Sequence, residues 1–303
     1  MKAGNSSRPG KASGILNSGC TIPGVNLPNG CSNSGFALSS YGVRIAIETN
    51  EPGILKRIPE DLLPGATMAG SRKADVRFFI SRDDEHAKGF ALYEDRRPIA
   101  HARSLPQLLV TLEAAAQHAV ARLCRKHVFI HAGVVRWKGR AIILPGRSFS
   151  GKSTLVLALV RVGATYYSDE FAVVDTKGRI HPFSRRPHVR TASGQKLRRK
   201  LQAASPDTGG KLPAVAECTV AVCKYKPCGR WKPRSMTKGE TLLELMGNTV
   251  VARTRPEDSL KILAKLVRKS TAFKTVRGDV GESARALLMH VNSRTPGMKG
   301  TRL

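Results

Sequence analysis

The sequence has no long hydrophobic run. Its longest apolar stretches are short, strand-like pieces such as Ala141–Leu144, whereas a membrane-spanning helix needs ~18 consecutive apolar residues. The N-terminal residues MKAGNSSRPGKASGILNSGC also lack the continuous apolar segment of a secretory signal. We therefore expect a cytoplasmic protein that does not bind a membrane.

Acidic and aromatic residues are scarce. The 303 residues include 51 Lys and Arg but only 22 Asp and Glu, a net charge of +29, and such a charge attracts polyanions. The excess is spread along the chain, its densest run is the short Lys196–Lys200, and only 5% of residues are aromatic and able to stack on bases. We expect no specific nucleic-acid partner, with a specific acidic partner as the alternative.

Closely paired cysteines are also missing. Three of the six cysteines form a C-x4-C-x4-C run, at Cys218, Cys223 and Cys228. Structural zinc sites usually have closer ligand pairs and a fourth ligand. This spacing favours scattered reduced thiols over a metal site.

Composition and periodicity divide the chain into four parts. Residues 1–41 are rich in Gly, Ser, Asn and Pro, which predicts a disordered tail. Residues 42–126 show alternating strand patterns and then apolar residues at helical spacing, which predicts a small N-terminal α/β module. Residues 127–289 predict a larger α/β domain, and 290–303 a basic tail. The fold class expected is α/β.

The larger domain carries the sequence GRSFSGKS, which fits G-x-x-x-x-G-K-[ST] at every fixed position. An apolar strand precedes it and an apolar-faced helix follows, as the phosphate-binding P-loop requires. Its glycines let the backbone N–H groups point at phosphate oxygens, its lysine reaches the β- and γ-phosphates, and its serine hydroxyl binds Mg²⁺. We predict that ATP and Mg²⁺ bind here. The expected nucleotide-binding residues are Gly146, Arg147, Ser148, Phe149, Ser150, Gly151, Lys152, Ser153 and Thr154.

A P-loop also needs a carboxylate to hold the metal or activate a nucleophile. Asp169 and Glu170 are adjacent acids at the end of a short apolar step. Asp175 ends the apolar strand Phe171–Asp175, but Thr176-Lys-Gly178 turns the chain straight into another strand. Asp175 is then a turn residue, so we favour Asp169 and Glu170 as the chemical pair.

Two further features allow a functional and a structural interpretation. His131 lies in the apolar strand before the P-loop, where a lone histidine is more often a core residue. Arg185, Arg186 and Arg190 follow the hairpin and could bind phosphate or remain surface charge.

The ordered combination of His131-Ala-Gly, GRSFSGKS, Arg161-Val-Gly-Ala164 and Tyr167-Ser-Asp169-Glu170 resembles the catalytic domain of the HPr kinase/phosphorylase family, particularly its short members. The likeness covers about Phe129 to Pro187. It implies a P-loop kinase domain on a mixed sheet, like that of phosphoenolpyruvate carboxykinase, which transfers the ATP γ-phosphoryl group to a hydroxyl, typically of a protein serine.

The resemblance also implies roles for single residues. Asp169 matches the carboxylate that deprotonates the acceptor, Glu170 matches the acid that holds the metal together with Ser153, and His131 matches an active-site histidine beside the P-loop Lys152. The chain departs from the family in two ways. Glu170 stands where the family usually has Asp, and the glycine-rich E-hydrophobic-R-G segment of the bifunctional enzymes is missing. These departures leave open both phosphorylase activity and HPr as the acceptor.

The sequence thus predicts an ATP-dependent kinase of a hydroxyl acceptor, with a protein serine as the first candidate. The alternatives are a kinase of a peptide or small molecule, and a non-catalytic nucleotide-binding regulator with a basic surface. The presence of both Lys152 and Asp169 favours catalysis, because a pure sensor needs no base. The acceptor and the oligomeric state, a homo-oligomer included, are left open.

Overall fold

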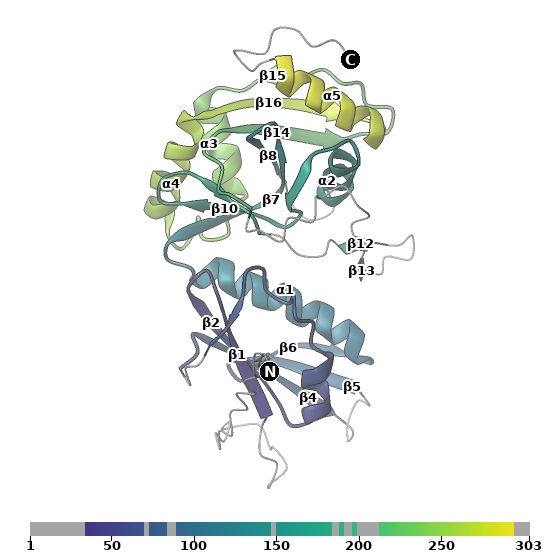
Figure 1. Ribbon diagram of the computed structural model, residues 1–303, viewed down its shortest axis with the longest axis vertical. Coiled ribbons are helices and arrows are strands. Elements are labelled where there is room, and N and C mark those ends of the chain that lie inside the picture. The colour runs from purple at the N-terminus through teal and green to yellow at the C-terminus, as the bar shows by residue number, and fades with distance from the viewer. Residues whose placement is uncertain are drawn as a thin grey trace, which may run out of the picture. The chain divides into compact units, whose positions relative to one another are not determined.

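The computed structural model describes residues 34–69, 73–83, 89–146, 150–183, 188–190, 196–198 and 212–293. These residues belong to two compact units, each described by itself. The first comprises the described parts of Met1–Glu60 and Ala66–Ala116, and the second those of Asp61–Gly65 and Gln117–Leu303 (Figure 1). None of the helices in the described segments is both long and apolar enough to cross a membrane.

The first unit contains a mixed six-stranded sheet in the order β3-β1-β2-β4-β5-β6, in which only β2 and β4 pair in parallel. Its strands are β1 (Ser34–Ser40), β2 (Val43–Thr49), β3 (Thr67–Met68), β4 (Val76–Asp83), β5 (Gly89–Glu94) and β6 (Arg97–Ala102). The 3₁₀ helix η1 (Pro52–Arg57) follows β2, and α1 (Leu105–Leu123) follows β6. The α/β character expected for this part of the chain is confirmed.

Three expected boundaries need correction. Residues 34–40 of the expected tail 1–41 form β1, because they pair along their whole length with the strongly apolar β2. The chain divides within α1, after Ala116, rather than at 126/127. Residues 290–293 of the expected tail 290–303 complete the last helix, where Val291 is buried. Residues 1–33 and 294–303 lie outside the described residues.

The second unit contains a mixed eight-stranded sheet in the order β11-β10-β7-β8-β14-β16-β15, with β9 paired to β7. Its strands are β7 (His127–Trp137), β8 (Arg140–Pro145), β9 (Thr165–Ser168), β10 (Phe171–Asp175), β11 (Ile180–His181), β14 (Cys218–Tyr225), β15 (Arg234–Ser235) and β16 (Ser270–Arg277). β14 runs parallel to both β8 and β16, and the other pairs are antiparallel. A separate two-stranded pair consists of β12 (His188–Arg190) and β13 (Lys196–Arg198).

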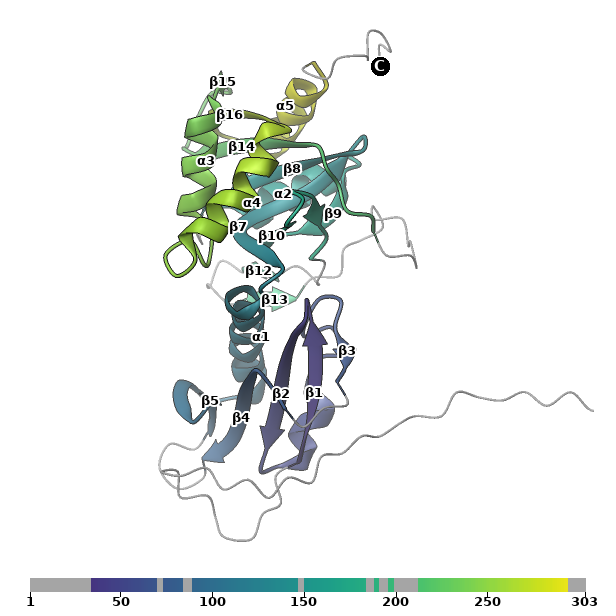
Figure 2. The same cartoon turned by 90° about the vertical axis from the view of Figure 1, so that its left-hand side faces the viewer.

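Four helices cover the two faces of this sheet, as Figure 2 shows. Helices α2 (Lys152–Arg161) and α5 (Val280–Ser293) pack on one face, and α3 (Lys238–Gly247) and α4 (Pro256–Arg268) on the other. Cys218 belongs to the core under α3 and α4, whereas Cys223 lies against the opposite core. The two thiols therefore face opposite sides of β14 and cannot share a metal ion. Burial raises the pKa of each to about 12.

The helix sequences explain this layering. In α4 the buried residues repeat at helical spacing, at Ser259, Ile262, Leu263, Leu266 and Val267. The helix begins at Pro256, and Asp258 lies in its first turn, where its charge complements the helix dipole.

The position of β7 determines what the sheet brings together. β7 lies between β8, which leads into the P-loop, and β10, which follows the acidic pair. On one side Ala132 is opposite Pro145, and on the other His131 is opposite Phe171. The start of the P-loop and the Asp169–Glu170 corner therefore lie on either side of the centre of β7.

Candidate active site

The backbone of the P-loop is fixed at both of its described ends. Gly146 donates its N–H to the carbonyl of His131 over 3.2 Å. Gly151 lies immediately before α2 with φ of +78°, a left-handed conformation that favours glycine. A Cβ at Gly151 would also collide with Arg277. Arg147, Ser148 and Phe149 lie outside the described residues.

The N-terminus of α2 has the properties of an anion site. No side chain caps it, and its first turn contains no acidic residue. The first N–H groups of a helix have no partner within the helix and carry its positive dipole end, so they bind phosphate well. Lys152 and Ser153 are half-buried in this first turn, and Thr154 is exposed.

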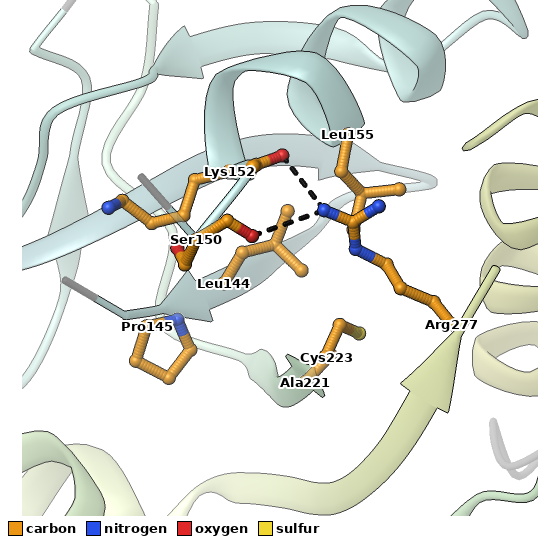
Figure 3. Close-up of a pocket in the computed structure, with 9 residues that line it drawn as sticks. Leu144, Pro145, Ser150, Lys152, Leu155, Ala221, Cys223 and Arg277 are labelled. Atoms are coloured by element: carbon orange, nitrogen blue, oxygen red, sulfur yellow. Dashed lines mark hydrogen bonds between the residues drawn. The ribbon is translucent and has the colours of Figure 1, made fainter. Parts of the chain in front are cut away.

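Arg277, at the end of β16, holds the opposite side of the loop. Its Nη2 donates to the carbonyls of Ser150 and Gly151, both over 3.2 Å. The side chain is 4% exposed, and burial lowers its pKa. Figure 3 shows the Lys152 side chain extending away from Arg277. Sequence reasoning missed this arginine, because no local motif marks it.

The acidic corner between β9 and β10 is shaped by two other residues that sequence reasoning did not single out. The Ser168 Oγ accepts the backbone N–H groups of Glu170 and Phe171, at 3.2 and 3.0 Å. The Tyr166 hydroxyl donates to Asp169 Oδ1 over 2.9 Å. Asp169 is 2% exposed. Its carboxylate is therefore held in place by the Tyr166 hydroxyl, and the hydrogen bonds to Ser168 fix the backbone turn that carries it.

Four of the predicted residues come together at this corner. His131 Nδ1 lies 4.0 Å from Glu170 Oε1, and its ring packs against Phe171 with centroids 4.9 Å apart. Burial lowers the pKa of Lys152, while the negative charges of Glu170 and Asp169 oppose that shift. Burial also lowers the pKa of His131, against the pull of Glu170 and with the help of Lys152. His131 thus lies beside Glu170, and Lys152 is near enough to both acids and to His131 for their charges to influence one another.

The donor set at this point fits Mg²⁺. The described residues contain no group of three or more His, Cys, Asp or Glu side chains arranged to hold a metal. Mg²⁺ in nucleotide sites is bound by one or two protein oxygens together with substrate phosphates and water. The Ser153 hydroxyl and the half-exposed Glu170 carboxylate are oxygen ligands of this kind.

Asp175 has a different role. It is 6% exposed and accepts hydrogen bonds from the backbone N–H groups of Lys177 and Arg179 and from the Arg179 Nε, at 2.8 to 2.9 Å. His181 Nε2 lies 3.0 Å from Asp175 Oδ2, the oxygen that also accepts the hydrogen bond from Arg179 Nε. Asp175 therefore anchors the β10–β11 hairpin, as the sequence pattern indicated. Arg185 and Arg186 lie outside the described residues, as does the side chain of Arg190.

Replacing Asp175 with Asn should lower the free energy of unfolding at pH 7 by about 2 kcal/mol, since hydrogen bonds to a buried charge contribute ~1.5–3 kcal/mol. Burial alone raises the pKa of Asp175, but the hydrogen bonds from His181 and Arg179 outweigh it and hold the pKa well below its ordinary value. The stabilisation is then present above the unfolded pKa of about 4 and is lost as the pH falls below it. Urea unfolding should show that the difference in free energy of unfolding between the unaltered protein and Asp175→Asn is smaller at pH 3 than at pH 7. Equal stability at pH 7 would contradict this role.

Comparison with known proteins gives a limited result. No protein-family model matches the sequence, and no curated protein matches it. The solved structure of the Hpr(Ser) kinase/phosphatase from Coxiella burnetii is similar to 55% of this chain and 97% of that chain, with 11% sequence identity and a TM-score of 0.30. A likeness this weak carries no conclusion about fold or activity.

Proposed function

We propose that this protein is a cytoplasmic, ATP-dependent kinase that transfers the γ-phosphoryl group to a hydroxyl, most directly that of a protein serine. The observation that carries the proposal is the convergence of Lys152, Asp169, Glu170 and His131 beside the N-terminus of α2. A protein that only binds a nucleotide needs the lysine, the helix end and one acid for the metal, whereas here the buried Asp169 carboxylate is present in addition to Glu170. The resemblance of Phe129–Pro187 to the HPr kinase/phosphorylase family, which implies a phosphoenolpyruvate-carboxykinase-like domain, agrees with this function.

In this proposal the phosphates bind first. The N–H groups at the start of α2 receive the phosphate oxygens, and Lys152 extends to the β- and γ-phosphates. The hydrogen bonds of Gly146 and Gly151 fix the two described ends of the loop before ATP arrives. Preorganised donors stabilise developing charge without the cost of reorganising at the moment of reaction.

The acceptor hydroxyl is then activated by Asp169. As the acceptor oxygen bonds to the γ-phosphorus and the bond to the leaving ADP oxygen breaks, the hydroxyl proton passes to the Asp169 carboxylate. The hydrogen bond from Tyr166 fixes the position of the Asp169 carboxylate. Glu170 and Ser153 would hold Mg²⁺, which supplies charge neutralisation at the phosphates when bound. His131, beside Glu170, orients that carboxylate.

The role of Glu170 gives a test of this arrangement. Glu170→Gln should raise the Mg²⁺ concentration needed for half-maximal phosphoryl transfer by about tenfold, because a neutral amide is a weaker magnesium ligand than a carboxylate. The measurement is a Mg²⁺ titration of the transfer rate at fixed ATP.

Glu217→Gln is the matched control, because Glu217 is an exposed glutamate paired with Arg140 at the far end of β8. It should leave the titration unchanged. If Glu170→Gln and Glu217→Gln behave alike, Glu170 does not hold the metal.

A further inference from the structure

A cavity of about 660 Å³ opens on the side of the P-loop where Arg277 lies. One wall is formed by the start of α2, at Ser150, Gly151 and Thr154. The other is formed by the end of β14 and by the turn from β16 into α5, including Tyr225 and Arg277. The proposed roles of Lys152, Asp169, Glu170 and His131 do not involve this cavity.

Tyr225 gives the cavity an aromatic surface. Its side chain is 55% exposed, and it is the one aromatic residue among the large apolar side chains that are exposed in the described part of the chain. One face of its ring is covered by the Arg277 guanidinium, whose carbon lies 5.2 Å from the ring centroid. A tyrosine that is held from one side and open on the other is a stacking surface for a flat ligand.

The surroundings keep this surface in place. The Lys226 N–H donates to the Arg277 carbonyl over 3.0 Å, which ties the chain after Tyr225 to the end of β16. Gly229 and Gly278 pack backbone to backbone so closely that a Cβ at Gly278 would lie 2.6 Å from the Gly229 carbonyl oxygen. These contacts make the wall rigid. Arg277 is 4% exposed, and its buried Nε has no hydrogen-bond partner among the described residues.

We propose that the Tyr225 ring, backed by Arg277, is the platform on which the base of the bound nucleotide stacks. This inference rests on the proposed function. Lys152 extends away from Arg277, so a nucleotide whose terminal phosphate reaches Lys152 and the acidic corner can direct its other end past Thr154 into the cavity. Arg277 then supports both the base site and the phosphate site, because its guanidinium lies over the tyrosine ring and donates to the P-loop carbonyls.

The test separates the base from the phosphates by using two probes. The affinities of Mg·ATP and of magnesium tripolyphosphate, which has no base, are measured by calorimetry. Tyr225→Ala should weaken ATP binding about tenfold, equivalent to ~1.4 kcal/mol, and leave tripolyphosphate binding unchanged. Tyr225→Phe should keep ATP affinity within about threefold, because stacking needs only the ring. Leu243→Ala, at a 75% exposed position on α3, is the matched surface control.

Each other outcome overturns the inference. Unchanged ATP affinity in Tyr225→Ala removes the platform but leaves the proposed function intact. An equal loss for both probes means that Tyr225 acts on the loop rather than on a base. If the unaltered protein binds neither probe, the proposed function fails and this inference with it.

A second measurement needs no substitution. Cys228 is an exposed free thiol on the cavity wall, and its alkylation can be followed by mass spectrometry of the peptide that contains it. Each ligand is added separately at a concentration that saturates the P-loop. ATP should slow the alkylation of Cys228, whereas tripolyphosphate should leave its rate unchanged. Equal rates with the two ligands would contradict a base in this cavity.

Discussion

Replacing Asp169 with Asn is expected to lower the rate of phosphoryl transfer by roughly 10²–10⁴-fold, the usual contribution of a general base, while ATP affinity stays nearly unchanged. The substitution keeps the shape of the side chain and leaves an oxygen that can accept the hydrogen bond from the Tyr166 hydroxyl. The variant loses the ability to take the acceptor proton. Transfer rates at saturating ATP and affinities by calorimetry separate the two effects.

Asp175→Asn is the matched control for this experiment, because Asp175 is also a buried aspartate on the same sheet but bonds only within the β10–β11 hairpin. It should retain transfer activity per folded molecule. If Asp175→Asn is inactive and Asp169→Asn is active, the chain is an ordinary P-loop nucleotide hydrolase and the kinase proposal fails.

Replacing Lys152 with Ala should have the next largest effect. The side chain is half-buried, and the negative charges of Glu170 and Asp169 act on it. Its removal should weaken ATP binding at least tenfold, or ~1.4 kcal/mol. Transfer efficiency should fall by about 10²–10³, because the charge that develops on the phosphates loses a preorganised partner. Calorimetry with Mg·ATP gives the first number, and initial rates give the second.

The strong positive charge of the chain makes a control necessary, since removing any lysine weakens the general attraction for ATP. Lys177→Ala removes an exposed lysine from the hairpin turn and should change neither quantity. Unchanged affinity in Lys152→Ala, with the fold intact, would remove the P-loop assignment.

The parts of the site that are contiguous in sequence could be predicted from it. The P-loop is a local pattern, and its flanking strand and helix appear as β8 and α2. The choice of Asp169 and Glu170 over Asp175 rested on a hairpin turn that is also local, and β10 and β11 form that hairpin. His131 could be placed on the strand before the loop, although its approach to Glu170 depends on the antiparallel register of β7 and β10.

The supporting residues could not be predicted, because their partners are distant in sequence. Arg277 is separated from Ser150 by 127 positions, and no periodicity links an arginine at the end of one strand to the carbonyls of a loop. Tyr166 and Ser168 are close to Asp169, but a tyrosine or serine in an apolar step resembles any other core residue. β1 was missed because its sequence is poor in large apolar residues and is held by pairing with β2.

The most direct test of the central claim is the fate of the label from γ-labelled ATP, incubated with Mg²⁺, the purified protein and a lysate of its host. We expect label in an acid-stable phosphate ester of a serine-containing acceptor, and labelling of that acceptor at least about 10²-fold slower when Asp169→Asn replaces the unaltered protein. Label that appears only as inorganic phosphate, or no release of label at all, would contradict the kinase proposal.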